Sequence, residues 1–419
     1  MVNPTRVVAT VCAVAATALV VSACSAGEEE SGEVTFWNPL TGADGEFMST
    51  LVSDFNGQAE ACVVDFQPIP ADDLYPRLYS VVNTGEDIPE LLLIHGPRVT
   101  EFGGAGLLEP LASLQEINPE LNRDNYLDVA WDAGVFDGVE YAVPLDLHGI
   151  VTYYNADLLA DYGVEHWLDD GIVTTEELFE VEGQLPDGVY AMPGLFVPAV
   201  VESQLFNVGS EFAPGGELDL TQQAMVDIYS DLLALDEAGL IAPEDSDDYQ
   251  VFNSGQALVF PDGTWAISNR NSIDGLNWGL SYNLQADASS PVNMLESHSF
   301  VQLIDGGRSE AADRCAADFL EYLRLNSAYW GEAGQVVASN VAFEDPAYSE
   351  LPQALLTNTE EARSTLATGE YIYTSYVMSA LWDNSQDIVR GRIPVEEALA
   401  AMQNEVAGKI AEAEAASGN

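Results

Sequence analysis

Basic residues are scarce in this chain of 419 residues. Lysine and arginine together number 12 against 69 aspartates and glutamates, which gives a net charge of −57 at pH 7, and Lys409 is the sole lysine. Nucleic acids and anionic lipid headgroups would repel such a molecule, so neither is an expected partner. Hydrophobic residues still make up 47% of the sequence, enough for a core beneath an acidic surface. Because salt screens repulsion between like charges, we expect a halophile-like protein that is more stable in molar salt.

Catalytic and nucleotide-binding motifs are also missing. The sequence contains no HExxH, CxxC or GxSxG pattern and no loop that ends in Gly-Lys-Ser or Gly-Lys-Thr. These absences argue against an enzyme, and no cofactor is implied. A glycosidase needs only two suitably spaced carboxylates, however, so a secreted carbohydrate-active enzyme stays open as an alternative in such an acidic chain.

Only one run is long, apolar and free of charge, and it stands at the start of the chain. Residues 7–21 follow Arg6 and lead into Ser22-Ala23-Cys24, and they are too few to span a membrane comfortably. The run predicts an export signal over residues 1–23, and the small residues before Cys24 resemble the lipobox of bacterial lipoproteins. We expect lipid on Cys24, an acidic tether over residues 24–32, and an extracytoplasmic protein anchored to the outer face of the cell membrane. A cleaved signal without lipid is the alternative.

Cysteine is rare in the rest of the chain, which contains Cys62 and Cys315 alone. Cys62 alternates with apolar residues of a predicted strand, and Cys315 shares a helix face with Phe319 and Leu323, so both are predicted to face a core. Two cysteines in an exported protein favour a disulfide over two buried thiols. Such a bond would put both residues in the same lobe.

Strands and helices alternate in the first third of the mature sequence. Strands are predicted at residues 34–37, 62–69 and 89–94, each followed by a helix, which favours a parallel α/β sheet. Helices dominate after residue 161, and a further strand is predicted at residues 300–304. The length suggests two domains. Because ligands of such sheets bind beyond the carboxyl ends of the strands, the loops 37–46 and 95–98 are candidate site loops.

Six blocks of sequence together carry a resemblance to a known family. They are residues 34–56, 89–108, 141–159 (YAVPLDLHGIVTYYNADLL), 254–265 (SGQALVFPDGTW), 316–323 and 391–406. In this order they resemble the extracellular solute-binding proteins of family 1, the maltose-binding-protein-like receptors of ABC sugar importers. Residues 163–218 match the family poorly, and Pro97 stands where sugar binders often have an acid.

The resemblance implies a two-lobed α/β fold of the periplasmic-binding-protein, or Venus-flytrap, type with a multi-crossing hinge. Residues 33–147 and 296–345 would form the N-terminal lobe, residues 152–291 and 350–419 the C-terminal lobe, and the hinge crossings would lie near 148–151, 292–295 and 346–349. It further implies a monomer that captures a mono- or oligosaccharide and delivers it to the membrane permease of an ABC transporter. A receptor for another small solute or ferric ion is the alternative.

A pyranose has an apolar face and a polar rim, so its site needs aromatic platforms and fixed hydrogen-bonding groups. The candidates are Trp37, Trp265 and Tyr376 as platforms and Asp44, Arg98, Asp146 and His148 as polar groups at the cleft. By motif, Arg98 occupies the place of a sugar-contacting arginine and Trp265 that of a stacking tryptophan. Each residue also has a structural interpretation: a tryptophan in the core, a surface ion pair, or a hydrogen-bonded histidine.

Overall fold

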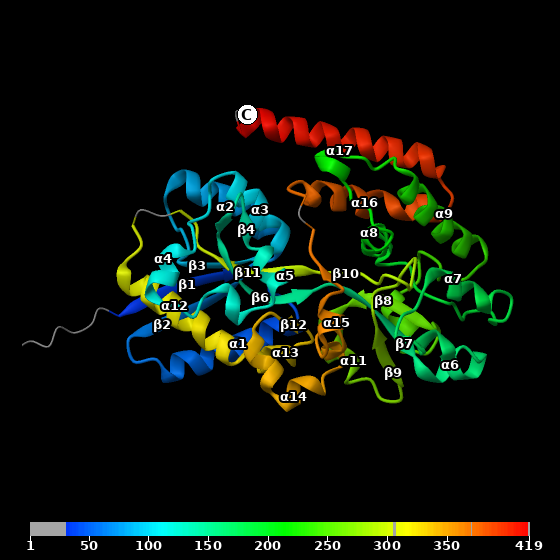
Figure 1. The fold of residues 1–419 in the computed structure, drawn as a ribbon, viewed down its shortest axis with the longest axis horizontal. Helices are drawn as coiled ribbons and strands as arrows, with labels where there is room; N and C mark the ends of the chain where they lie inside the picture. Colours follow the sequence, from blue (N-terminus) through cyan, green and yellow to red (C-terminus); the bar gives the residue numbers. More distant parts are fainter. Residues whose placement is uncertain (1–30, 305–306, 370, 418–419) are drawn as a thin grey trace, which may run out of the picture. The chain divides into compact units, whose positions relative to one another are not determined.

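The computed structural model describes residues 31–304, 307–369 and 371–417 (Figure 1). The predicted signal peptide, Cys24 and most of the predicted tether lie outside these residues. From Ser31 onward the chain belongs to one structural unit. Among the described residues, none of the helices has both the length and the apolar character that a bilayer crossing requires.

A six-stranded sheet forms the first part of the fold. Its strands, in spatial order, are β12 (Val336–Val337), β6 (Ala142–His148), β11 (Glu296–Val301), β3 (Leu91–His95), β1 (Gly32–Asn38) and β2 (Cys62–Pro68). β1 runs parallel to β2 and β3, whereas β11 runs antiparallel to both of its neighbours and β12 antiparallel to β6. The three strands predicted in the first third of the mature sequence are thus parallel, as predicted, and the later strands β11 and β12 make the whole sheet mixed. The strand predicted at residues 300–304 begins earlier, at Glu296.

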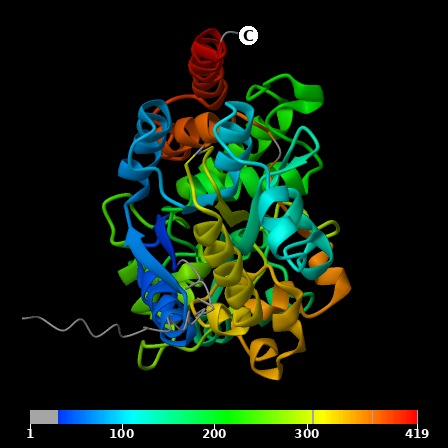
Figure 2. The same ribbon diagram turned by 90° about the vertical axis from the view of Figure 1, so that its left-hand side faces the viewer.

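Helices cover both faces of this sheet. They are α1 (Ala43–Gln58), α2 (Ala71–Thr84), α3 (Gly96–Gly104), α4 (Ala112–Ile117), α5 (Asp128–Asp132), α12 (Glu310–Leu325), α13 (Ser327–Gly331) and α14 (Pro346–Ser349). α1 and α12 pack against each other and against β2, and Figure 2 shows them side by side in blue and yellow. α2 and α3 cover the opposite face.

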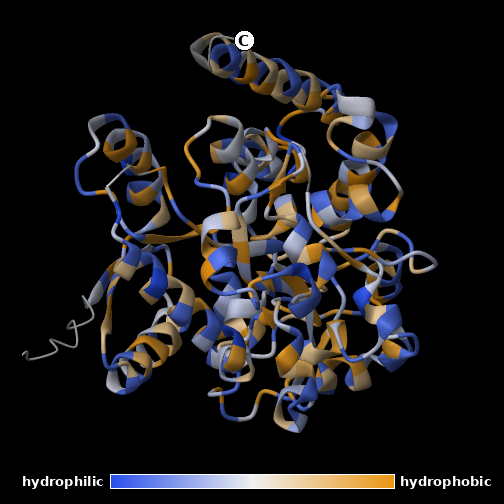
Figure 3. Ribbon diagram, turned by 60° about the vertical axis from the view of Figure 1, so that its left-hand side comes forward, coloured by the Kyte–Doolittle hydropathy of each residue, from blue (hydrophilic) through white to orange (hydrophobic). Residues whose placement is uncertain are grey.

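Alternation along the strands explains this layered packing. Phe36, Leu91 and Leu93 are buried in the hydrophobic cluster that contains α1 and α12, whereas Trp37 and Leu92 are buried in the cluster that contains α2 and α3. Successive side chains of a strand point to opposite faces, so a strand covered on both sides is apolar throughout. In Figure 3 the helices show mixed blue and orange residues, as expected where only one side of a helix is covered.

A smaller antiparallel sheet, in the order β8-β7-β9, forms the second part of the fold. Its strands are β7 (Ile150–Asn155), β8 (Val259–Gly263) and β9 (Trp278–Ser281). The helices of this part are α6 (Ala156–Tyr162), α7 (Thr175–Leu178), α8 (Val197–Asn207), α9 (Gln223–Glu237), α10 (Asp248–Asn253), α11 (Ile267–Arg270), α15 (Glu360–Arg363), α16 (Thr374–Val389) and α17 (Val395–Ser417). The Asn155 side chain caps α6 by accepting a hydrogen bond from the Leu158 amide, 3.1 Å away.

Short elements complete the chain. Two small strand pairs are β4 (Val135–Phe136) with β5 (Val139–Glu140), and β10 (Asn293–Met294) with β13 (Leu366–Ala367). The 3-10 helices are Arg123–Asn125, Glu165–Leu168, Phe179–Val181, Pro214–Gly216, Thr264–Ala266, Asn340–Glu344 and Pro352–Leu356. α8, α9, α16 and α17 pack on one another, and Figure 1 shows α17 beside α16 and α9.

Two single-residue links connect the six-stranded sheet to other strands. Gly149 alone separates β6 from β7 of the second sheet, and Leu295 alone separates β11 from β10 of the β10–β13 pair. The links touch, because a Cβ atom on Gly149 would lie 2.7 Å from the Leu295 Cδ2 atom and 2.9 Å from the Met294 carbonyl oxygen. A side chain at position 149 would therefore force the two links apart.

A disulfide between Cys62 on β2 and Cys315 on α12 ties the first sheet to a helix that covers it. The Cα atoms of the two residues lie 5.3 Å apart, and 253 positions separate them in the sequence. Both cysteines are buried in the same hydrophobic cluster as Phe36. The bond thus closes a covalent loop that contains most of the chain, including all of the second sheet.

Candidate functional site

A cavity of about 880 Å³ lies beside the single-residue links at Gly149 and Leu295. Its volume is in the range of small-molecule sites in proteins. It is lined by residues 39–44, 95–97, 100, 132–133, 135–138, 148–150, 196, 199, 202, 265, 269, 283, 294–298, 335, 368–369, 372, 374, 378 and 382. Elements of both sheets therefore contribute to one site.

Three aromatic rings form one wall of this cavity. Phe196 precedes α8, Trp265 lies in the 3-10 helix after β8, and Trp382 lies on α16. The Phe196 ring stands edge-on to both tryptophans, at centroid distances of 6.1 Å to Trp265 and 5.8 Å to Trp382. Trp382 is 44% exposed, so part of an apolar ring is open to a ligand. Such rings can stack on the apolar face of a small solute.

The backbone before Trp265 fixes the position of its ring. A Cβ atom on Gly263 would lie 2.0 Å from the Trp265 Cε2 atom, so the ring rests directly on the glycine and no larger residue fits. The Asp262 carboxylate accepts a hydrogen bond of 2.7 Å from the Gly263 amide and a second of 2.5 Å from the Arg270 guanidinium. Asp262 and Arg270 are buried, and the Arg270 Cζ atom lies 3.7 Å from the centre of the Tyr153 ring.

Carboxylates supply the charge of the cavity. Asp44, Asp132, Asp137, Glu202 and Glu296 line it, and among the lining side chains in the described part of the chain none is a lysine or arginine. Burial, together with the charge of Glu296, raises the pKa of Glu202 to about 8. Glu202 is therefore protonated at neutral pH and can donate a hydrogen bond, whereas an ionised carboxylate accepts them. This lining favours neutral or cationic solutes over anions.

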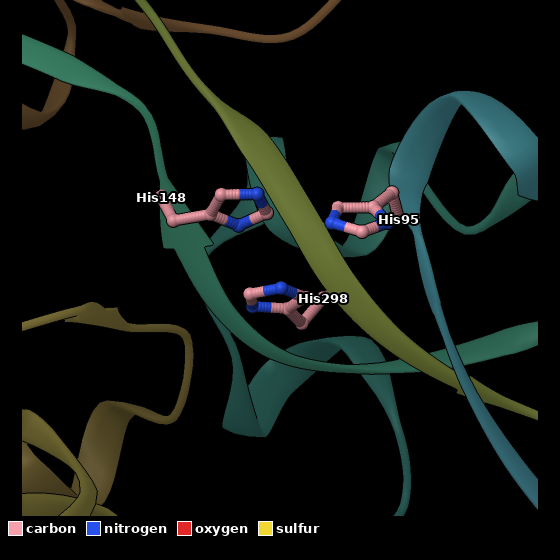
Figure 4. A group of neighbouring side chains, drawn as sticks. All are labelled: His95, His148 and His298. Atoms are coloured by element: carbon pink, nitrogen blue, oxygen red, sulfur yellow. The ribbon is translucent and has the colours of Figure 1, made fainter. Parts of the chain in front are cut away.

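Three of the four histidines of the chain gather on the floor of the cavity (Figure 4). His95 ends β3, His148 ends β6 and His298 lies on β11, and one nitrogen from each ring lies within 4.8 Å of the other two. The His148 and His298 rings are stacked at a centroid distance of 3.8 Å. The His95 ring centre lies 5.5 Å from that of His148 and 5.1 Å from that of His298.

Asp146 lies beneath this cluster and does not line the cavity. Its side chain is fully buried and accepts hydrogen bonds from the His298 Nδ1 atom at 3.0 Å and from the Trp330 Nε1 atom at 2.7 Å. Although burial raises the pKa of Asp146, the neighbouring His298 and His148 lower it more, and the net pKa lies well below the usual range. Burial lowers the pKa of His298, but the Asp146 carboxylate outweighs it and raises the pKa.

His95 is held by a different partner. Its Nδ1 atom hydrogen-bonds the Tyr75 hydroxyl, which also accepts a hydrogen bond of 3.2 Å from the His95 amide. Burial lowers the pKa of His95 well below its usual value, and the charges of His298 and His148 act in the same direction. His95 is therefore a neutral imidazole, and its Nδ1 atom faces away from the other two rings.

Of the residues predicted from the sequence, Asp44, His148 and Trp265 line the cavity, and Trp37, Arg98, Asp146 and Tyr376 do not. Trp37 is 2% exposed, and its Nε1 atom donates a hydrogen bond to Gln67 at 3.0 Å. Arg98 forms an ion pair with Glu101 and stacks over the Tyr75 ring at 4.6 Å. Tyr376 stacks on Tyr373 at 6.0 Å.

Several lining residues were not predicted from the sequence, among them Phe196, Glu202, His298 and Trp382. Phe196 and Glu202 fall in the segment 163–218, where the family pattern gave no guide. Trp382 lies on a helix outside the six blocks, and His298 lies in a strand whose start was predicted too late. The one available signal for His298 was that the chain has only four histidines. With so few, any site that uses several histidines must draw on most of them.

Comparisons with known proteins agree on one family. The family model for "Bacterial extracellular solute-binding protein" matches residues 38–279, more than half of the chain. The sn-glycerol-3-phosphate-binding periplasmic protein UgpB of Agrobacterium fabrum is 22% identical over 346 residues, which cover 75% of this chain and 76% of that protein.

Solved structures show the same architecture. The ABC substrate-binding protein from Listeria monocytogenes in complex with cycloalternan has a TM-score of 0.76 at 16% identity, with 91% of this chain and all of that chain covered. The GacH receptor of Streptomyces glaucescens, solved unliganded and with acarbose, has a TM-score of 0.75 at 18% identity, with 90% of this chain and 97% of that chain covered. At these identities the likeness establishes the two-lobed periplasmic-binding-protein fold.

Proposed function

Because the chain belongs to the bacterial extracellular solute-binding proteins, we propose that its cavity captures a carbohydrate, a mono- or oligosaccharide, for import by an ABC transporter. The cycloalternan and acarbose complexes of the two similar structures support this proposal. The protein then delivers the bound sugar to the membrane permease.

The observation that carries the proposal is that one cavity combines an aromatic wall with several carboxylates. Phe196, Trp265 and Trp382 offer ring faces and edges to the apolar side of a pyranose. Asp44 and Glu296 offer charged acceptors to hydroxyl groups, and such charge-assisted hydrogen bonds are stronger than neutral ones. A neutral polyhydroxylated solute can stack on the aromatic rings and also donate hydrogen bonds to the carboxylates.

The lining also argues against a phosphorylated solute such as the one named for the Agrobacterium relative. A phosphate needs cationic groups or several free donors. Arg98, the nearest candidate from the sequence, is engaged by Glu101 and Tyr75 instead. We therefore expect neutral sugars to bind and glycerol 3-phosphate to bind weakly.

Solute capture in this proposal includes closure of two lobes around the ligand. The lobes are residues 33–147 with 296–345 and residues 152–291 with 350–419, and the crossings lie near 148–151, 292–295 and 346–349. The single-residue links at Gly149 and Leu295 support this division, because a short link between sheets is where a hinge can bend. The closed, monomeric form is the one that the permease recognises.

Calorimetric titration with a panel of neutral oligosaccharides, polyols, glycerol 3-phosphate and ferric citrate tests the solute class. Trp265→Ala should weaken binding of the best sugar by more than tenfold, because it removes one of the two tryptophan rings of the wall. Trp278→Ala is the matched control, since Trp278 is also partly buried but lies outside the cavity. Far-UV circular dichroism checks that both variants fold. Tight binding of glycerol 3-phosphate, or equal sugar affinity in Trp265→Ala and the parent, would refute the proposal.

A carbohydrate-active enzyme is the second candidate, and Glu202 is the observation that favours it. A carboxyl group with a pKa of about 8 near a second carboxylate could act as a general acid. We propose that the protein binds its solute unchanged, as a solute-binding receptor does. Chromatography of the bound sugar after long incubation tests this, and cleavage that disappears in Glu202→Gln would establish the enzyme instead.

The proposal places the receptor outside the cytoplasm, held to the outer face of the cell membrane by lipid on Cys24. The charge-free run at residues 7–21 and the small residues before Cys24 support removal of residues 1–23. Residues 24–32 then tether the folded part. Its acidic surface suits a saline medium, where screening reduces repulsion between the carboxylates.

A further inference from the structure

We propose that His95, His148 and His298 form a binding site for one borderline transition-metal dication, such as Zn²⁺, on the floor of the cavity. The three rings come from three different strands of the six-stranded sheet, yet one nitrogen of each lies within 4.8 Å of the others. Imidazole nitrogen is a preferred ligand of Zn²⁺, Cu²⁺ and Ni²⁺. His166, the remaining histidine of the chain, lies elsewhere and pairs with Glu180.

The hydrogen bonds of the cluster leave the correct nitrogens free. The His298 Nδ1 atom donates to the Asp146 carboxylate, so the lone pair of its Nε2 atom is available, and the His95 Nε2 atom has its lone pair available in the tautomer whose Nδ1 atom donates to the Tyr75 hydroxyl. A carboxylate that accepts from the second nitrogen of a histidine is the usual support of a metal ligand, because it fixes the tautomer and increases the basicity of the ligating atom. Asp146 occupies that position here.

His148 is the ring that can adjust. It is 6% exposed, its Nδ1 atom lies 3.4 Å from the Asp146 Oδ1 atom, and among the described residues that nitrogen has no hydrogen-bond partner. The stacked His148 and His298 rings have parallel planes, whereas two imidazoles on one ion must point at a common centre. A ligand nitrogen lies about 2.1 Å from Zn²⁺, so the three nitrogens must draw closer than they now are. A turn of the unbonded His148 ring removes the stacking and moves its nitrogen toward the other two, and small shifts of the His95 and His298 rings complete the approach.

A carboxylate stands next to this position. The Glu296 Oε2 atom lies 3.8 Å from the His148 Nε2 atom, and the Glu296 side chain is 40% exposed and lines the cavity. It can serve as the fourth ligand of a tetrahedral ion or be displaced by a solute oxygen. A bound dication would also supply a permanent positive charge at the cavity floor, which attracts electron-rich groups of the solute.

The proposal is tested on protein that has been stripped with a chelator and dialysed into 0.5 M salt, where weak adsorption to the acidic surface is screened. Titration with Zn²⁺ alone, against a chromophoric competitor, should show one equivalent bound with micromolar or tighter affinity. His148→Asn and His95→Asn should each weaken this binding by at least a hundredfold. His166→Asn, the matched control, should bind like the parent.

Absence of stoichiometric Zn²⁺ binding to the parent, or equal binding in His148→Asn, would overturn the proposal. If the variants fail to fold by circular dichroism, electron paramagnetic resonance of the Cu²⁺-loaded parent gives an independent test. Coordination by imidazole nitrogens supports the site, and an all-oxygen signal refutes it. No sugar enters these experiments, so their failure leaves the carbohydrate proposal untouched.

Discussion

The buried ion pair of Asp262 and Arg270 allows a sharp test of how the second sheet is stabilised. The two side chains are 0% and 1% exposed, and among the described residues the Arg270 Nε and Nη1 atoms have no hydrogen-bond partner. Asp262→Asn removes the single carboxylate that faces the guanidinium, so a buried cation is left uncompensated. Such a loss costs about 3–5 kcal/mol of unfolding free energy. Arg270→Met leaves an unpaired buried carboxylate and should cost a similar amount, although methionine preserves packing on the Tyr153 ring.

The double variant separates pairing from packing. The double variant Asp262→Asn with Arg270→Met contains neither buried charge. Its loss of unfolding free energy should therefore be smaller than the sum of the two single losses, by at least about 2 kcal/mol. Urea unfolding followed by tryptophan fluorescence at pH 7 gives the free energies. Glu244→Gln, which breaks the exposed pair with Arg392, is the control and should leave the unfolding midpoint unchanged. Additive losses, or a single loss under about 1 kcal/mol, would show that the pair contributes little.

Glu202 and Cys24 give two further predictions. The pKa of Glu202 rises on folding from 4.5 to about 8, so folding takes up a proton between these values, and the unfolding free energy should fall by up to about 1.4 kcal/mol per pH unit as pH rises through that window. Urea unfolding in chelator-containing buffer should show this slope in the parent and not in Glu202→Gln, and equal slopes would contradict it. Cys24→Ser should abolish incorporation of a labelled fatty acid and release the protein into the medium. Retained label would exclude Cys24 as the lipidation site.

Much of the fold could be predicted where burial alone decides the sequence. Leu91 to Ile94 are apolar at every position because β3 is covered on both faces, and this run identified the strand. β11 was placed too late for the opposite reason. Its first four residues are polar, because Glu296, Ser297 and His298 line the cavity and the Ser299 hydroxyl bonds that of Ser297, so only Phe300 and Val301 carried a strand signal.

The site was less predictable because its partners are distant in sequence. A strand pattern shows that Phe36 and Trp37 face opposite sides, but it does not show which side meets a ligand, and both proved to be covered by helices. Asp146 was expected to contact the solute, whereas its bond with His298 links positions 152 residues apart. No local pattern reveals such a contact. Trp265 was accessible to motif reasoning because Gly263, on which its ring rests, is only two residues away.

The place of β11 inside the six-stranded sheet constrains the order in which the chain can fold. A nascent chain emerges N-terminus first, so β3 and β6 appear well before β11, the strand that lies between them in the finished sheet. Until residues 296–301 arrive, the early strands present unpaired edges, which are the features most prone to pair with other chains. Cys315 emerges later still, so its bond to Cys62 forms only after β11 is available. Oxidation of this pair therefore follows the interval in which the early strand edges are unpaired.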